Sequence, residues 1–137
     1  MSREQNQKTQ EALAEAINSG DLEKMDDLFT DDVVDHDPAE GQGPGPQGFK
    51  DFFATMRSAF PDLKTAPEAI VLDEDTAAIA YTLTGTHEGE FQGIAPTGRK
   101  IEARGMQIAR FEDGKIAERW GSSDELGILK QLGAIED

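Results

Sequence analysis

Residues 99–123 read RKIEARGMQIARFEDGKIAERWGSS, and this stretch decides the fold. It contains two strand-like runs on either side of Asp113 and Gly114, a pair that is typical of tight turns. Two similar runs stand upstream, around a turn signal at residues 73–75. The expected strands cover residues 64–72, 76–86, 99–111 and 115–123. Consecutive strands with short turns predict an antiparallel sheet.

The first part of the chain is predicted to be helical. Apolar residues recur at helical spacing before Gly20, and Asp21 can cap a second helix. A short extended piece, residues 33–37, leads into a loop rich in Gly and Pro at residues 41–48. The expected helices cover residues 3–18, 22–29, 49–60 and 124–132. Helices grouped early and strands grouped late predict an α+β domain whose sheet is covered on one face.

The composition excludes several classes of function. The chain has 137 residues, so residues 1–137 fit one domain. Its 28 acidic residues outnumber 13 lysines and arginines, which leaves a formal charge of −15. Phosphate backbones and anionic lipid surfaces repel such a protein, so we expect neither nucleic acid nor a membrane as partner. The absence of cysteine excludes thiolate catalysis and cysteine-ligated metals.

The N-terminal residues are polar and do not resemble a signal peptide, and no apolar run reaches membrane-spanning length. We therefore expect a cytoplasmic protein. The acid excess also raises the hypothesis of a salt-adapted source, in which case the unfolding midpoint would rise with added salt.

The turn between the last two strands leaves two registers open. If residues 112–114 connect the strands, Met106 faces the same side as Trp120. If only residues 113–114 form the turn, Gln107 replaces Met106 beside the tryptophan. We favour the three-residue connection.

The favoured register has a second consequence for charged side chains. It brings Arg110 and Glu118 within diagonal reach on one face, whereas the alternative register separates them onto opposite faces.

Several segments together resemble the SnoaL-like polyketide cyclases, also called ester cyclases, of the nuclear-transport-factor-2-like superfamily. The resemblance extends across nearly the whole chain, with Trp120 and Asp124 between the last two segments. The segments are FK at 49–50, AFPDL at 59–63, GTHEGEFQGIAPTG at 85–98, DGKI at 113–116 and QLG at 131–133. The resemblance implies a cone-shaped fold, in which a curved antiparallel sheet wraps around N-terminal helices and encloses an internal pocket. It also implies a homodimer, because superfamily members often pair through the outer face of the sheet.

In the characterised cyclases, an intramolecular aldol reaction closes a ring without a metal or organic cofactor, and one aspartate is the acid and base. By its position after the tryptophan, Asp124 matches that aspartate. The chain departs from the family on the strand before the Asp113-Gly114 turn, where Gln107 and Arg110 stand in place of a histidine.

The residues themselves offer a reason for such a role. If residues 116–124 stay extended, Trp120 and Asp124 share one face, so that the indole can shield the carboxyl group from water. A carboxyl group in an apolar pocket has a raised pKa and can exchange protons near neutrality. The alternative is structural, because Ser122 and Glu125 form a capping-box pattern and an acid at a helix start meets the helix dipole favourably.

Other candidates would surround the substrate. His36 shares a strand face with Val34, which predicts an inward imidazole that contacts a substrate oxygen, unless a neighbouring aspartate or carbonyl satisfies it. Tyr81 is expected to face the interior, where its hydroxyl orients substrate or finds a backbone partner. His87 and Phe91 lie in the Gly-rich segment that would form a lid, although Phe91 is equally suited to anchor that loop. Met106, with Trp120 and Phe91, would supply the apolar wall.

The sequence thus predicts a cofactor-free enzyme that performs acid/base chemistry, such as aldol cyclisation or isomerisation, on an apolar carbonyl-containing small molecule. Asp124 and His36 are its expected catalytic residues. No metal site is expected, since Asp35, His36 and Asp37 are adjacent and would point to alternating faces of a strand. The alternatives are a non-catalytic binding protein that uses the same pocket and a module for association.

Overall fold

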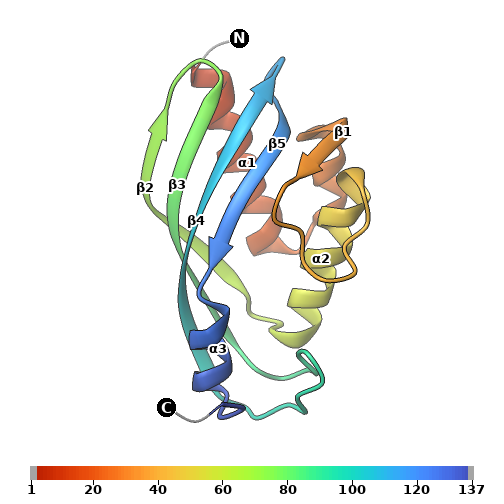
Figure 1. Ribbon diagram of the computed structural model, residues 1–137, viewed down its shortest axis with the longest axis vertical. Helices are drawn as coiled ribbons and strands as arrows, with labels where there is room; N and C mark the ends of the chain where they lie inside the picture. The colour runs from red at the N-terminus through yellow and green to blue at the C-terminus, as the bar shows by residue number, and fades with distance from the viewer. Residues whose placement is uncertain (1–2, 136–137) are drawn as a thin grey trace.

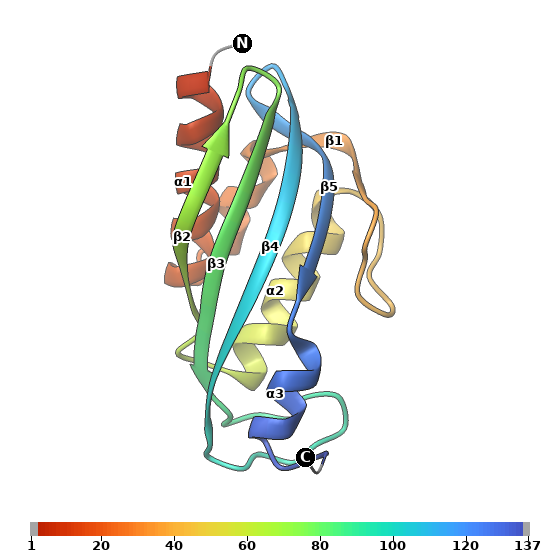
Figure 2. The same ribbon diagram turned by 60° about the vertical axis from the view of Figure 1, so that its left-hand side comes forward.

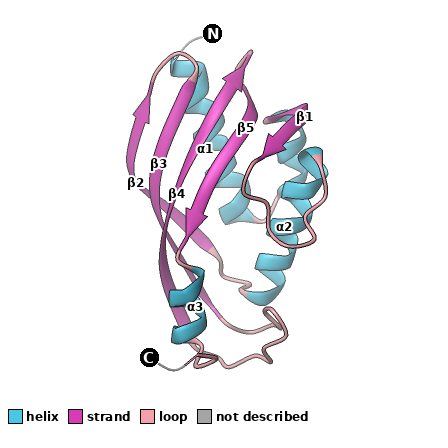
Figure 3. Cartoon of the chain, viewed as in Figure 1, coloured by secondary structure: helices cyan, strands magenta, loops and turns pink. Residues whose placement is uncertain are grey.

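The computed structural model describes residues 3–135. Five strands form one sheet, and three α-helices and a 3₁₀ helix accompany it (Figure 1; Figure 3 distinguishes helices from strands). The elements are α1 (Arg3–Ser19), a 3₁₀ helix (Leu22–Asp27), β1 (Phe29–Asp35), α2 (Gly45–Ala59), β2 (Lys64–Leu72), β3 (Thr76–Thr86), β4 (Lys100–Glu112), β5 (Lys115–Ser123) and α3 (Glu125–Gln131).

The sheet has the order β1-β5-β4-β3-β2, and all neighbouring strands run antiparallel except the edge pair β1 and β5. The sheet is curved, and α1 and α2 lie along one of its faces (Figure 2). We call the face beneath these helices the inner face and the opposite one the outer face. The α+β fold predicted from the sequence is confirmed.

Two local predictions need correction. The expected helix over 22–29 is a shorter 3₁₀ helix, and Phe29 begins β1, where its ring stacks on Phe49 with centroids 4.5 Å apart. Helix α2 begins at Gly45, inside the expected loop, because Pro46 falls in its first turn, where the missing backbone N–H costs no hydrogen bond. Stacking on Phe49 explains the first difference from the expected helix boundaries, and the position of Pro46 explains the second.

The core lies between the inner face and the helices. Buried apolar side chains come from α1, α2 and alternate positions of the strands, which is the arrangement expected for a sheet covered on one side. In β4 buried residues alternate with more exposed ones, apart from the half-buried Gln107 on the inner face. The largest fully buried apolar side chains are Met25, Phe29, Phe60, Leu63, Ile116 and Ile128. No helix among residues 3–135 is long and apolar enough to cross a membrane.

The turn of the β4–β5 hairpin contains two residues. Glu112 pairs directly with Lys115, and both turn residues between them have positive φ, 52° at Asp113 and 79° at Gly114. This is the geometry of a type I′ turn, whose twist matches that of the flanking strands. The three-residue connection that we favoured is therefore wrong.

A β-bulge then shifts the register further along the hairpin. Phe111 pairs with Ile116 but Arg110 pairs with Glu118, so Ala117 is the extra residue. Because of the bulge, Met106 and Trp120 do share a face. That face is the outer one, which decides the position of every candidate on these two strands.

Candidate active site on the inner face of the sheet

Four polar side chains meet on the inner face, and we call Asp35, Tyr81, Gln107 and Arg119 the inner-face cluster. Arg119 is at its centre: Nη1 donates to both carboxylate oxygens of Asp35, at 3.1 and 3.3 Å, and Nε donates to Oε1 of Gln107 at 3.3 Å. The side chains of Arg119 and Asp35 are only 20% and 7% exposed. The ion pair therefore holds the guanidinium in one place with little water around it.

Asp35 is held from three directions. Besides Arg119, its carboxylate accepts hydrogen bonds from the backbone N–H of Asp37 at 3.0 Å and from Nε2 of Gln42 at 3.1 Å. These bonds use both carboxylate oxygens. Asp35 is thus suited to position Arg119 rather than to accept a proton from a substrate.

Two glycines provide the floor of the cluster. A Cβ atom on Gly105 would collide with the ring of Tyr81, and one on Gly121 would collide with the guanidinium of Arg119. Gly105 stands opposite Tyr81 on β3, and Gly121 stands opposite Gln107 on β4. The missing side chains let Tyr81 and Arg119 lie flat across the sheet, which brings them together.

The hydroxyl of Tyr81 remains protonated in this setting. Burial raises the pKa of Tyr81 above its ordinary value of 10, while the charge and hydrogen bond of Arg119 oppose that rise. Near neutral pH the cluster therefore presents two kinds of donor, a phenolic O–H and a guanidinium. Such a pair can bind a carbonyl oxygen and stabilise the negative charge that develops on it during enolate formation.

Asp124 lies at the end of β5 and caps α3. Its Oδ1 accepts a hydrogen bond from the backbone N–H of Gly127 at 2.9 Å, and its side chain is exposed. The prediction that Trp120 shields this carboxyl group in an apolar chamber is wrong, because the indole lies on the outer face. The structural alternative, a helix-start residue, describes the contact that is present, although the cap is Asp124 itself and not Ser122.

Residues 7–132 match the sequence profile of the family described as SnoaL-like polyketide cyclase. The chain belongs to this family. Among curated relatives of this SnoaL-like chain is aklanonic acid methyl ester cyclase AcmA of Streptomyces galilaeus, which is 30% identical over 132 residues, covering 88% of the chain and 85% of the relative.

Solved structures of similar fold agree with that assignment. TsrD of Streptomyces laurentii superposes with a TM-score of 0.90 at 27% identity, covering 98% of the chain and 99% of TsrD. Wild-type IdmH of Streptomyces antibioticus superposes with a TM-score of 0.82 at 36% identity, covering 93% of the chain and 98% of IdmH. The expected nuclear-transport-factor-2-like architecture of the SnoaL-like cyclases is therefore present.

Three residues expected in the pocket lie on the outer face of this SnoaL-like domain. Trp120 is 37% exposed and Met106 is 62% exposed. His36 does share a face with Val34 as expected, but its ring stacks on Trp120 at 4.5 Å and 11°, and Nε2 lies 3.4 Å from Glu118. The expected inward orientation of all three is wrong, because the bulge at Ala117 leaves Arg119, not Trp120, on the inner face.

His87 and Phe91 are buried instead of covering a pocket mouth. Nδ1 of His87 accepts a hydrogen bond from the backbone N–H of Thr97 at 3.1 Å, and the ring of Phe91 packs edge-on against Phe60 at 5.3 Å. Both side chains fasten the loop between β3 and β4 to the core. The alternative that Phe91 is an anchor fits these contacts. Nε2 of His87 is buried and unpartnered.

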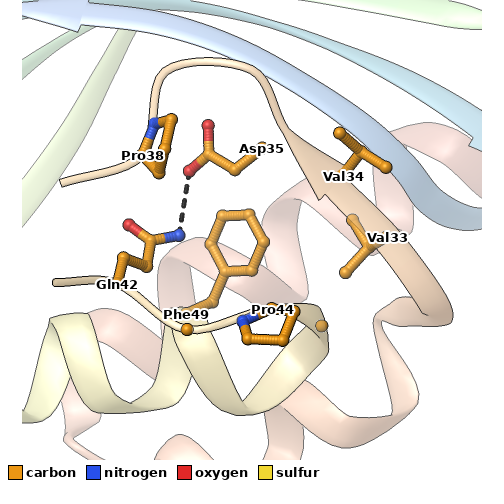
Figure 4. A pocket seen from close by; sticks show the side chains of 9 residues that line it. Val33, Val34, Asp35, Pro38, Gln42, Pro44 and Phe49 are labelled. Atoms are coloured by element: carbon orange, nitrogen blue, oxygen red, sulfur yellow. Dashed lines mark hydrogen bonds between the residues drawn. The ribbon is translucent and has the colours of Figure 1, made fainter. Parts of the chain in front are cut away.

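A pocket opens at the side of the domain, between β1, the following loop and α2 (Figure 4). Its volume is about 330 Å³. We call it the loop pocket; its lining consists of Val33, Val34, Asp35, Pro38, Gln42, Gly43, Pro44, Gly45 and Phe49. It shares Asp35 with the inner-face cluster, so the two features adjoin through one carboxylate.

Of the predicted site residues, only Tyr81 occupies the inner-face cluster. Asp35 and Arg119 were not among the predicted site residues, and Gln107 was named only in the choice of register and as a residue that stands in place of the family histidine. A signal was available: an arginine in a strand that is otherwise half buried needs a partner, and Asp35 is the acid that β1 brings to it. Within residues 3–135, no three metal-binding side chains of His, Cys, Asp or Glu are grouped around a common point.

Proposed function

We propose that this protein is a cyclase-type enzyme that acts by acid/base chemistry on an apolar, carbonyl-containing small molecule bound at the inner face. The observation that carries the proposal is the guanidinium of Arg119, which Asp35 fixes beside the hydroxyl of Tyr81. A fixed pair of donors in a site with little water can stabilise an oxyanion strongly, because it needs no rearrangement when charge develops.

In the proposed reaction a base removes a proton from carbon next to a carbonyl, and the oxygen of the resulting enolate binds Arg119 and Tyr81. The enolate carbon then forms a bond to the carbon of a second carbonyl, whose oxygen receives the proton. Substrate and product of this aldol step have the same atoms. Asp124 is the proposed proton shuttle. The family position that it occupies supports this role, and its exposed carboxylate caps α3 in this structure.

Replacing Asp124 by Asn tests the shuttle. Asparagine caps helices about as well as aspartate, so α3 keeps its cap while the ionisable group is lost. The assay is conversion of aklanonic acid methyl ester, the compound named in the relative AcmA, to an isomer of equal mass by liquid chromatography and mass spectrometry. We expect turnover to fall at least about 10²-fold with unchanged stability. Unchanged turnover would remove Asp124 from the mechanism.

The same variant separates an enzyme from a binding protein. If the wild-type protein binds the ester but does not convert it, and the Asp124→Asn variant binds it equally well, the non-catalytic alternative holds. Binding can be followed by the rise in melting temperature with ligand concentration.

We also propose that the protein forms a homodimer through its outer face. Five exposed apolar side chains gather there, and we call Val34, Val71, Met106, Ile108 and Trp120 the outer-face patch. A contiguous apolar patch on a sheet face is typical of an interface. Ile108 stands between Ala78 and Trp120 in neighbouring strands, near the middle of the patch.

Light scattering after size-exclusion chromatography tests the dimer. We expect Ile108→Arg to give a monomer, because it would bury two unpaired charges in the interface. The control is Leu126→Arg, since Leu126 is similarly exposed but lies on α3, away from the patch. A wild-type protein that is monomeric at micromolar concentration would contradict this part of the proposal.

A further inference from the structure

Part of the wall of the loop pocket is apolar and buried. Val33 and Phe49 are among the core residues, 5% and 6% exposed, and both border the pocket. Pro38 and Pro44 add apolar surface from the loop (Figure 4). An apolar-walled space gains free energy when an apolar group replaces the water inside it.

The loop that forms the outer wall is held in its conformation by its own contacts. Gln42 accepts a hydrogen bond from the backbone N–H of Ala39 at 3.0 Å through its side chain, and its backbone N–H donates to the carbonyl of Ala39 at 3.0 Å. On the other side, Gly48 has no room for a Cβ because the carbonyl of Gly43 lies against it. The pocket is therefore preformed, and a ligand need not order the loop on binding.

One edge of the pocket is polar. Nε2 of Gln42 donates to Oδ2 of Asp35 at 3.1 Å, and Figure 4 shows this bond at one side of the pocket, with Phe49 next to it. A hydroxyl group can take part at this edge in both directions, because it donates to the carboxylate and accepts from the amide. The carboxylate of Asp35 and the net charge of −15 both repel an anion, so a neutral ligand is favoured.

The volume limits the size of the occupant. An engineered apolar cavity of roughly 150 Å³ binds benzene, and ligand pockets generally begin at roughly 300 Å³. At about 330 Å³, the loop pocket has room for two fused six-membered rings but not for a large polycyclic compound.

We propose that the loop pocket is a binding site for a neutral bicyclic ring system that carries a hydroxyl group, separate from the inner-face cluster. The rings contact Val33, Pro44 and Phe49, and the hydroxyl lies at the polar edge, where it donates to Asp35 and accepts from the second N–H of the Gln42 amide. This site does not depend on the reaction proposed above. Because Asp35 also holds Arg119, an occupant of the pocket touches a carboxylate that positions the guanidinium.

The probe for the test is 2-naphthol, with naphthalene-2-sulfonate as an anion that has the same ring system. We expect saturable binding of 2-naphthol, followed by its fluorescence, and at least about tenfold weaker binding of the sulfonate. In methyl NMR spectra, the signals of Val33 and Val34 shift on addition of 2-naphthol, whereas that of Val71, at the far edge of the sheet, does not.

Matched variants locate the site independently. Val34→Trp enlarges a residue that borders the pocket and should weaken 2-naphthol binding at least about tenfold. Val71→Trp is the control, because Val71 is also an exposed valine on the outer face but does not border the pocket. Gln42→Leu removes the amide and should weaken binding roughly three- to tenfold, the value of one hydrogen bond, while Gln47→Leu in α2 should not.

Circular dichroism establishes that each variant folds before binding is measured, and Gln42→Leu serves if Val34→Trp does not fold. Three results would overturn the proposal: no binding of 2-naphthol up to 1 mM, shifts confined to inner-face methyl groups such as Leu83, or equal binding by the Val34 and Val71 variants. Inner-face variants that lose cyclase activity should still bind 2-naphthol at the loop pocket, so the two proposals fail separately.

Discussion

Replacing Gly105 by Ala tests the construction of the inner-face cluster. The added Cβ would lie 2.7 Å from Cε1 of Tyr81 and closer still to the end of the ring, which is at least about 0.7 Å short of ordinary contact at 3.4 Å. The ring must therefore rotate away from the sheet, and its hydroxyl leaves Arg119. We expect both stability and turnover to fall.

The size of the stability effect follows from two opposing contributions. Forced overpacking of this kind costs about 1–3 kcal/mol. Without the collision, alanine in a strand is more stable than glycine by roughly 0.5–1 kcal/mol. The collision disappears when Tyr81 is replaced by Ala, so Gly105→Ala should then be neutral or stabilising.

The assay is urea unfolding followed by circular dichroism on the wild type, both single variants and the double variant. We expect Gly105→Ala alone to lower the free energy of unfolding by up to about 2.5 kcal/mol, and the cycle to give a coupling energy of about 1–3 kcal/mol, the cost of the collision alone. An equal cost of Gly105→Ala with and without the Tyr81 ring would refute the reasoning, since the glycine would then not be making room for it.

Two further predictions concern charged groups. Arg119→Lys keeps the charge but cannot bond Asp35 and Gln107 together. We therefore expect kcat to fall by roughly 10²–10³-fold while KM changes little. A raised KM with unchanged kcat would contradict the oxyanion role. The pKa of Glu118 lies below its ordinary value of 4.5, chiefly because of its hydrogen bond with Arg110. The pair therefore stabilises the fold fully above the ordinary pKa, and this stabilisation is lost as the pH falls and the carboxylate is protonated. Acid unfolding below about pH 5 should therefore be less steep in Glu118→Gln than in the wild type, and equal pH dependence of the two proteins would contradict the assignment.

The boundaries of the strands were predictable because they depend on local signals. The expected limits of β2, β3 and β5 coincide with the observed ones, and β4 differs by one residue at each end. Turn residues and alternating patterns act within a few positions and need no partner from elsewhere in the chain. The edge strand β1 was less predictable, because Phe29 joins it through stacking on a residue of α2.

The sequence partly indicated which face of the β4–β5 hairpin is exposed to solvent. In β4, charged residues occupy even positions such as Glu102 and Arg104, whereas Ile101 and Ala103 are buried. This pattern directs the even face to solvent. Our prediction did not use this pattern and took Trp120 as a core residue, since a large aromatic side chain is buried more often than not.

The sequence by itself determined the α+β class, the strand limits and the resemblance to SnoaL-like cyclases, because each rests on local patterns. Tertiary structure alone decided that Arg119, and not Trp120, faces the helices. The physical reason is that strand periodicity separates side chains into two sets but does not say which set is covered. The bulge at Ala117, the pairing of β1 with β5 and the packing of α1 and α2 on one face made that choice.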